Sequence, residues 1–146
     1  MRPQQEPIGL EVSRTGRLLQ RAFDEQLLAA GGSLPVWLIV TALKRNNHRM
    51  QRDLAAAVGI EDATLTHHLN RMEQAGVVVR QRDPANRRNQ IVTLTEDGER
   101  MFSSLLASVV AFDRRLRQGL TAHELEMLRD LLARVRANIA ATAADG

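Results

Sequence analysis

Apolar side chains recur every three or four residues along most of this chain, a spacing typical of amphipathic helices. The spacing predicts a helix over residues 10–30 and a second helix that begins after Ser33, a residue able to cap it. Two short helices are predicted next, over residues 51–58 and 62–76. A tight turn that begins at Gly59 separates them, so they form a closely joined pair.

After residue 76 the helical spacing gives way to a β-type pattern. Residues 77–81 begin with β-branched side chains, and residues 90–94 alternate between polar and apolar ones. The run Asp-Pro-Ala-Asn at residues 83–86 lies between them and is typical of a turn. These segments predict two short strands that form a β-hairpin with a polar loop.

Helical spacing returns after the hairpin. Thr95 can cap a long helix that has Glu96 and Asp97 in its first turn, where the helix dipole favours acidic side chains. Thr121 and Glu124 have the spacing of a capping box, which predicts the start of a last helix. The chain beyond residue 139 consists of small and polar residues, so we expect that end to fray.

The order of these elements predicts a mainly α fold with a small β-hairpin wing, namely a winged helix-turn-helix with flanking helices. We expect an N-terminal dimerisation helix over residues 1–32, a winged lobe over 33–98 and C-terminal dimerisation helices over 99–146. The apolar stripes of the flanking helices exceed what one small lobe can cover. We therefore expect a homodimer through residues 10–30 and 99–140, intertwined as one domain.

The residue types present argue against several kinds of chemistry. The sequence has no cysteine, which excludes disulfides, thiolate nucleophiles and zinc–thiolate sites. No serine lies in a nucleophile elbow, and no glycine-rich phosphate loop follows a strand. The histidines lack the spacing of a metal site; they are His48, His67, His68 and His123. We therefore expect no enzyme, no cofactor and no bound metal.

No segment has the features of a membrane span. No apolar run approaches the roughly 20 residues that a spanning helix needs, and residues 1–9 lack the apolar stretch of a signal peptide. We therefore expect a cytoplasmic protein with no membrane partner.

The excess positive charge lies in the middle of the chain. Residues 44–94 carry nine Lys and Arg against five Asp and Glu, and the segments on either side are nearly neutral. A lobe that binds a polyanion explains this distribution, and an unevenly charged solvated surface explains it equally well. The positions of the charged residues must decide between the two.

The second helix of a helix-turn-helix pair enters the major groove of DNA. At 100° per residue, Leu65, Leu69 and Met72 form the inward stripe of the helix predicted over residues 62–76. The opposite face carries small and hydrogen-bonding side chains that suit base edges, although an ordinary solvated face is the alternative. The members of this face are Ala63, Thr64, His67, Asn70 and Arg71.

The predicted hairpin is basic. It carries four arginines around one aspartate, namely Arg80, Arg82, Arg87 and Arg88 around Asp83. Arginine on an exposed hairpin can enter a narrow minor groove, where the potential is most negative. A loop kept soluble by charge is the alternative, but the hairpin directly follows a helix-turn-helix. We therefore predict double-stranded DNA as the partner; a helical protein-binding module is a further alternative that leaves the hairpin unexplained.

Four runs between residues 51 and 98 carry a resemblance to a known family. They are Gln-Arg-Asp-Leu-Ala at 51–55, the helix from Thr64 to Gly76, Asp-Pro-Ala-Asn-Arg-Arg at 83–88, and Leu-Thr-Glu-Asp-Gly at 94–98. On these runs the chain resembles the MarR family of transcription regulators, and the flanking helices fit as well. The resemblance implies an obligate dimer that binds an operator, expected here to be a repressor released by a small ligand.

The resemblance also assigns individual residues. The positions where the family's recognition helix meets DNA correspond to Thr64, Thr66, His67 and Arg71, and the family's wing arginine corresponds to Arg88. Arg82 and Arg87 complete the expected DNA-contacting set. Asn86 departs from the family, which usually has Asp there, so we expect Arg88 to be held less rigidly.

Many members of the family bind small, often phenolic anions between the dimer helices and the DNA-binding lobes. Trp37, with Arg17 or Arg21 of the first helix, would supply stacking and charge for a small aromatic or anionic effector. The alternative is that Trp37 is a core residue and the two arginines are solvated. A metal-responsive regulator of the same fold is the other alternative for control.

Overall fold

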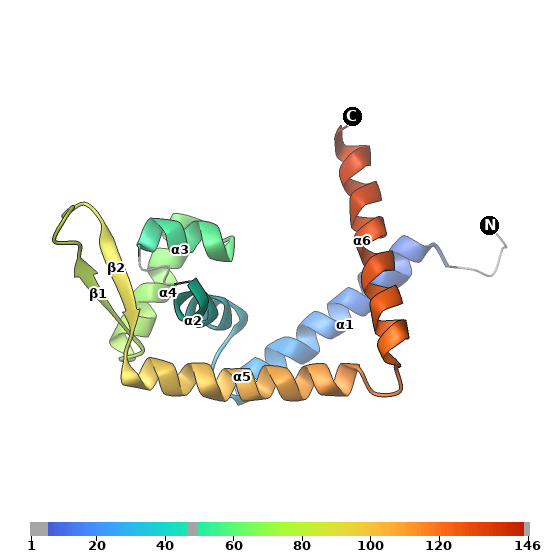
Figure 1. The fold of residues 1–146 in the computed structure, drawn as a ribbon, viewed down its shortest axis with the longest axis horizontal. Helices are drawn as coiled ribbons and strands as arrows, with labels where there is room; N and C mark the ends of the chain where they lie inside the picture. Colours follow the sequence, from blue (N-terminus) through green and yellow to red (C-terminus); the bar gives the residue numbers. More distant parts are fainter. Residues whose placement is uncertain (1–5, 47–49, 145–146) are drawn as a thin grey trace. The chain divides into compact units, whose positions relative to one another are not determined.

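The computed structural model describes residues 6–46 and 50–144 and confirms the predicted fold class. Within this part of the chain, helices predominate and two strands form one hairpin (Figure 1). The elements are α1 (Ile8–Ala29), α2 (Leu34–Asn46), α3 (Gln51–Val58), α4 (Asp62–Gln74), β1 (Val78–Arg82), β2 (Gln90–Leu94), α5 (Glu96–Leu116) and α6 (Ala122–Ala144). The chain divides into two compact units, Met1–Val110 and Ala111–Gly146, with the boundary inside α5.

Two glycines in the left-handed region set the ends of the helix pair. Gly59 (φ 67°) ends α3, and its conformation turns the chain sharply toward α4. Gly76 (φ 73°) follows α4 and leads directly into the hairpin. Glycine adopts this conformation without the strain that a Cβ would bring, so both turns are short.

The hairpin is antiparallel, and its register pairs Val78 with Leu94 and Arg82 with Gln90. A single antiparallel bridge also joins Met50 to Ile91, which holds the start of α3 beside β2. Because side chains alternate along a strand, the hairpin has one face toward the core and one toward solvent.

The core of the first unit lies where the helix pair, the hairpin and parts of α1, α2 and α5 meet. Every one of these elements contributes at least one fully buried aliphatic side chain, so the lobe is one packed body. The largest such side chains are Leu27, Ile39, Val40, Leu54, Leu65, Leu69, Val78, Val92 and Leu105.

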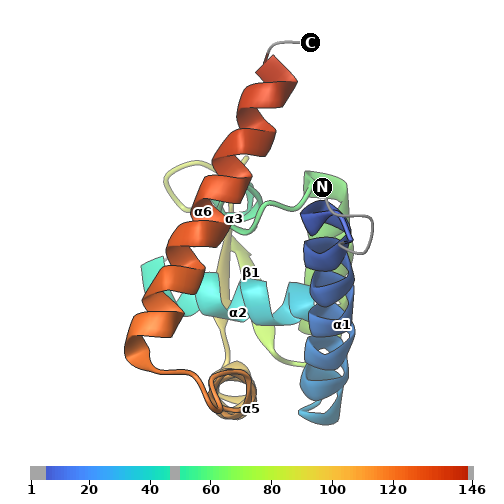
Figure 2. The same cartoon turned by 90° about the vertical axis from the view of Figure 1, so that its right-hand side faces the viewer.

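The first part of α5 packs against α2. Figure 1 shows α2 nearly end-on above α5, and Figure 2 shows α5 end-on below α2, so the two helices lie at a large angle to each other. The rings of Trp37 and Phe102 stack with centroids 6.0 Å apart and an interplanar angle of 7°. Beside them, the Lys44 Nζ lies 2.6 Å from the Glu99 Oε2 and 5.8 Å from the centre of the Phe102 ring. These contacts fix α2 on the first half of α5.

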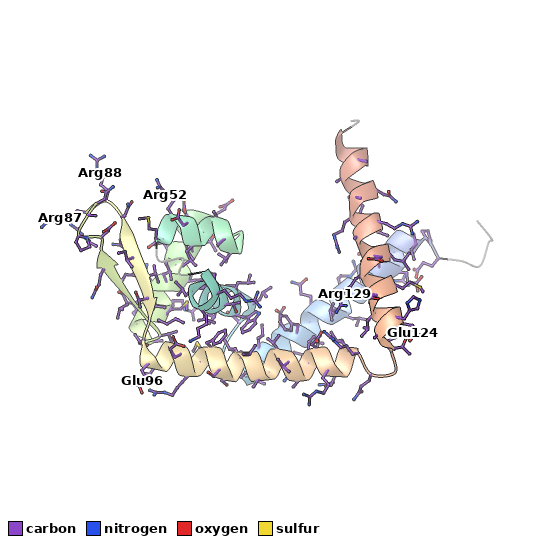
Figure 3. All side chains as sticks on the ribbon, in the orientation of Figure 1. Arg52, Arg87, Arg88, Glu96, Glu124 and Arg129 are labelled. Carbon is purple, nitrogen blue, oxygen red and sulfur yellow. The ribbon has the colours of Figure 1, made fainter. Side chains whose placement is uncertain are left out.

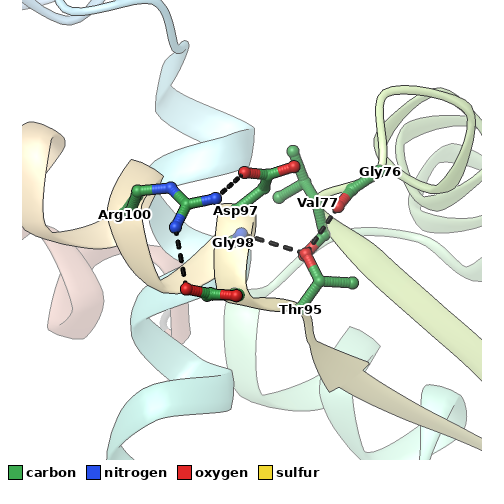
Figure 4. A network of polar contacts seen from close by, with 7 residues as sticks. Gly76, Val77, Thr95, Asp97, Gly98 and Arg100 are labelled. Carbon is green, nitrogen blue, oxygen red and sulfur yellow. Dashed lines mark hydrogen bonds and ion pairs between the residues drawn. The ribbon is translucent and has the colours of Figure 1, made fainter.

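The junction of hairpin and α5 is held by a single threonine (Figure 4). The Thr95 hydroxyl donates to the carbonyl oxygen of Gly76 at 2.5 Å and accepts the backbone N–H of Gly98 at 3.1 Å. Thr95 thus caps α5 as predicted and ties the start of α5 to the end of the helix-turn-helix.

The second unit begins within α5 and contains α6. The predicted capping box is present, because the Thr121 N–H donates to the Glu124 Oε2 at 2.7 Å and the Glu124 N–H donates to the Thr121 Oγ1 at 3.2 Å. The Thr121 N–H and, to a smaller extent, the Thr121 hydroxyl donate to the Glu124 carboxylate and lower its pKa below the ordinary value. The expected fraying beyond residue 139 was wrong, since α6 continues to Ala144; the alanines there are good helix formers.

Candidate nucleic-acid interface

The inward stripe of α4 is buried as predicted. Leu65 and Leu69 are fully buried and Met72 nearly so, because these side chains pack into the core of the lobe. Their burial leaves the opposite face of the helix to solvent. The exposed residues include all five predicted for that face, Ala63, Thr64, His67, Asn70 and Arg71. Their contact with DNA stays a prediction.

Thr66 differs from these neighbours because it faces α3. It is half-buried, and its hydroxyl donates to the Asp62 carbonyl at 2.8 Å and accepts from the Gln51 Nε2 at 2.9 Å. The first bond lies within α4, and the second, from Gln51 of α3, joins the two helices of the pair. The structure therefore gives Thr66 a part in fixing the angle between α3 and α4, beside the DNA contact that the family resemblance implies.

His67 and His68 occupy adjacent but different environments on α4. Their rings are 5.8 Å apart in an edge-to-face arrangement, with His67 exposed and His68 half-buried. Burial lowers the pKa of His68, and the positive charges of His67 and Arg71 lower it further. His68 is therefore neutral at physiological pH, able to accept a hydrogen bond at one ring nitrogen and donate at the other.

The tip of the hairpin is shaped by two side-chain turns. The Asp83 Oδ1 accepts the Ala85 N–H at 2.9 Å, and the Asn86 Oδ1 accepts the Arg88 N–H at 3.1 Å. Asn86 thus orders the backbone at Arg88 through a bond that needs no negative charge. The tip presents its arginines to solvent; they are Arg82, Arg87 and Arg88.

The assignment of Arg80 to the exposed basic cluster was wrong. Its side chain is only 15% exposed and pairs with Glu73 of α4, with the Nη2 and Oε2 atoms 2.7 Å apart. The same Nη2 donates to the Asn70 Oδ1 at 2.5 Å. The hydrogen bonds from the Arg80 side chain lower the pKa of Glu73, and so do the Arg80 backbone N–H and its positive charge. Arg80 therefore joins the hairpin to α4 instead of extending into solvent, and three arginines remain in the exposed cluster.

Sequence reasoning missed Arg52 of α3. Figure 3 shows Arg52 in the first turn of α3, beside the hairpin, with its side chain pointing in the same direction as Arg88. Both arginines line a depression of about 400 Å³ that lies between the start of α3 and β2. The available signal was the position of Arg52 two residues before the buried Leu54, which places it on the outer side of a short helix.

A larger cavity of about 520 Å³ lies on the inner side of α4, between that helix, the α1–α2 turn and the start of α5. Its walls are mostly apolar and include Val36, Met72 and Met101. His68 and Arg71 supply its polar side. This volume and this mixture of residues are typical of a site for a small organic molecule.

The structure places the residues predicted to bind an effector in separate surroundings. Trp37 stacks on Phe102 and packs against the core, which favours the core alternative for this residue. Arg17 donates to the Ser13 Oγ at 2.8 Å and lies with Arg21 along the exposed surface of α1. A joint role for Trp37, Arg17 and Arg21 stays a prediction.

Within residues 6–46 and 50–144, no three His, Asp or Glu side chains lie close enough together to hold a metal ion; His48 falls outside these ranges. In the same ranges, no helix taken singly has the length and apolar character to cross a bilayer, although α1 and α2 together meet the criteria as a pair bent by 72°.

The helix pair with an exposed α4 face, followed by a basic hairpin, defines a winged helix-turn-helix DNA-binding domain. Comparison with known proteins gives the family. Residues 33–89 match the model of the MarR family. A MarR-family transcriptional regulator from Rhodococcus sp. RHA1 is 26% identical and has a similar structure, with a TM-score of 0.73 over 92% of this chain and 96% of that one.

Two structures of CouR are also similar. CouR from Rhodococcus jostii RHA1 bound to p-coumaroyl-CoA is 26% identical, with a TM-score of 0.72 over 92% of this chain and 95% of that one. The transcriptional repressor CouR bound to a 23-mer DNA duplex is 23% identical, with a TM-score of 0.78 over 89% and 92%. Residues 33–89 of the chain thus match the MarR family of transcriptional regulators, and its structure is similar to that of a member of this family.

Proposed function

We propose that this protein is a non-enzymatic cytoplasmic repressor that binds a double-stranded DNA operator as a homodimer. The observation that carries the proposal is the position of Arg52, Arg87 and Arg88 on the same lobe as the exposed face of α4 (Figure 3). A helix that presents hydrogen-bonding groups fits the major groove, and arginines on a wing fit phosphates and the adjacent minor groove. The structure of CouR on a DNA duplex supports this use of the fold.

The individual side chains have distinct roles in this proposal. Ala63 and the Thr64 methyl group contact thymine methyl groups, while His67 and Arg71 donate to guanine. Arg82, Arg87 and Arg88 neutralise phosphates or enter the minor groove, as does Arg52 from α3. Affinity then comes largely from charge, and sequence preference comes from α4.

Selection of bound fragments from random duplex DNA tests the proposal. We expect an inverted repeat whose half-sites are about one helical turn, 34 Å, apart. Binding to that sequence should weaken steeply with salt, because each neutralised phosphate contributes about −0.9 to the slope of log affinity against log salt concentration. Failure to enrich any sequence, or a flat salt response, would contradict the proposal.

The wing and the recognition helix should respond differently to mutation. Arg88→Ala is expected to weaken binding to all sequences and to reduce the salt slope by about 1, because the arginine contacts charge and groove shape. His67→Ala is expected to relax preference at one base pair by about 1–3 kcal/mol. Gel-shift titrations against the selected operator and its single-base variants measure both effects. Equal losses on all sequences for both variants would show that the roles are not divided.

The homodimer is proposed through the helices outside the winged lobe, residues 1–32 and 99–146. Apolar side chains remain largely exposed there in the single chain, on both α1 and α6. They include Ile8, Leu10, Leu18, Leu28, Met127, Leu128, Leu131 and Ile139. A second copy would cover these side chains and place two lobes side by side for an operator with two half-sites.

Control by a small organic anion is the last part of the proposal. The cavity behind α4 supports it, because a carboxylate held there would meet Arg71 and His68 on the helix that is proposed to read DNA. CouR with bound p-coumaroyl-CoA shows that a protein of this fold takes an organic ligand. A coupling free energy of about 1–3 kcal/mol between ligand and operator would weaken DNA binding 5- to 150-fold.

Titration of aromatic carboxylates into the protein–operator complex is expected to release the DNA, whereas zinc and peroxide should not. The Val36→Phe variant serves as the matched control, because the larger side chain fills the cavity without touching the exposed face of α4. This variant should bind the operator normally and resist release. Release by zinc or peroxide alone, with none by any carboxylate, would exclude an organic anion as the effector.

A further inference from the structure

Asn70 lies on the exposed face of α4, one helical turn after His67. Its amide has one accepting oxygen and one donating NH2 group, and the side that faces DNA determines which bases it can recognise. The orientation of such an amide is set by its other hydrogen bonds. In this structure a residue of the hairpin, Arg80, supplies such a bond.

Arg80 of β1 holds the amide oxygen. Its Nη2 donates to the Asn70 Oδ1 at 2.5 Å and to the Glu73 Oε2 at 2.7 Å, and its Nε donates to the same Glu73 oxygen at 3.2 Å. The Arg80 backbone N–H donates to the Glu73 Oε1 at 3.2 Å. A guanidinium group only donates, so the amide atom that faces it must be the oxygen. Because Glu73 anchors Arg80 at three points, the amide of Asn70 cannot reverse without losing its partner.

We propose that Arg80 is a positioning residue that fixes Asn70 as a hydrogen-bond donor toward DNA, so that Asn70 selects guanine or thymine and disfavours adenine at the base it meets. The inference rests on the proposed DNA-binding function. An asparagine free to use both ends of its amide binds adenine bidentately, accepting from N6 and donating to N7. With its oxygen held by Arg80, Asn70 keeps only the NH2 group. That group meets two acceptors on guanine (N7 and O6) and the O4 acceptor on thymine. On adenine it can still donate to N7, but the second bond of the bidentate pair is lost and the N6 donor has no acceptor opposite it.

The operator selected by the wild-type protein provides the first test. Asn70→Ala is expected to relax base preference at one position in each half-site, and the wild type should prefer guanine or thymine there. A wild-type preference for adenine at that position would overturn the inference, as would a uniform loss of affinity on all sequences. A wild type that enriches no sequence would instead overturn the proposed function, so the two failures are distinguishable.

Two more variants test whether Asn70 must present a hydrogen-bond donor to DNA. Asn70→Asp keeps an oxygen for Arg80 but replaces the outward NH2 group with a carboxylate oxygen, so operator affinity should fall at least about tenfold. Gln118→Glu makes the same amide-to-acid change at an exposed position of the α5–α6 turn, outside the helices proposed to form the dimer, and should bind like the wild type. Equal affinities for the two variants would overturn the inference.

Arg80→Gln, checked by its thermal midpoint to be folded, frees the amide of Asn70 to turn. This variant should accept adenine at the position that Asn70 reads. An unchanged base preference in folded Arg80→Gln would show that Arg80 does not set the amide.

Discussion

Among Gly→Ala substitutions at the glycines that the structure describes, Gly98→Ala is expected to destabilise the winged lobe the most. Gly98 lies buried in the first turn of α5, beside the Thr95 cap (Figure 4). A Cβ there would overlap the carbonyl oxygen of Val77 and lie 3.0 Å from the Leu94 Cδ2. Backbone cannot move aside as a flexible side chain can, so we expect a loss of about 3 kcal/mol, at the upper end of ordinary overpacking.

Thermal unfolding followed by circular dichroism measures this loss. For a chain of this size, a loss of about 3 kcal/mol lowers the midpoint by about 6–12 °C. Gly9→Ala is the matched control, because Gly9 is also helical and a Cβ at that position meets nothing within 4 Å. The control should be neutral or slightly stabilising. Equal midpoints for the two variants, at one protein concentration, would show that α5 does not pack on Val77 in this way.

Leu128→Glu is expected to abolish the homodimer and, with it, most of the operator affinity. Leu128 remains 46% exposed in the single chain, and it shares one face of α6 with Leu125, Leu132 and Val135. A carboxylate buried there without a partner would strongly oppose assembly. A single lobe loses the gain from binding two half-sites at once, so affinity should fall by about 10²- to 10⁴-fold.

Ala133→Glu is the control for this variant. It adds the same charge to α6 on the side opposite Leu128, so the dimer and operator affinity should be retained. Sedimentation velocity at micromolar concentration reports the oligomeric state, and gel shifts report DNA binding. A Leu128→Glu protein that stays dimeric would place the interface elsewhere, and a monomer with undiminished affinity would show that DNA binding does not need the dimer.

The features predicted correctly from the sequence are those set by near neighbours in the chain. The burial of Leu65, Leu69 and Met72 follows from helical spacing alone, and the bonds of Thr121 and Glu124 follow from a motif of four residues. The hairpin strands were predicted to within one residue for the same reason.

The errors at the proposed DNA surface concern pairs of residues from different elements. Arg80 and Arg82 have the same residue type on the same strand, yet only Arg80 meets Glu73, because the turn at Gly76 folds β1 back on α4. The bond that Gln51 donates to Thr66 likewise depends on the angle between α3 and α4. Local spacing carries no information on such contacts, so the sequence without its fold left Arg80 among the solvated arginines.

Lys44 is the single lysine of the sequence, and its amine pairs with Glu99 where α2 contacts α5. Every cation of the proposed DNA surface is instead an arginine or a histidine. Acylation removes charge from lysine, whereas a guanidinium group stays protonated throughout the physiological pH range. Lysine acetylation would therefore leave the positive charge of this surface unchanged. Among side chains, an amine-directed label would modify Lys44, at the contact between α2 and α5, and none of the residues proposed to contact DNA.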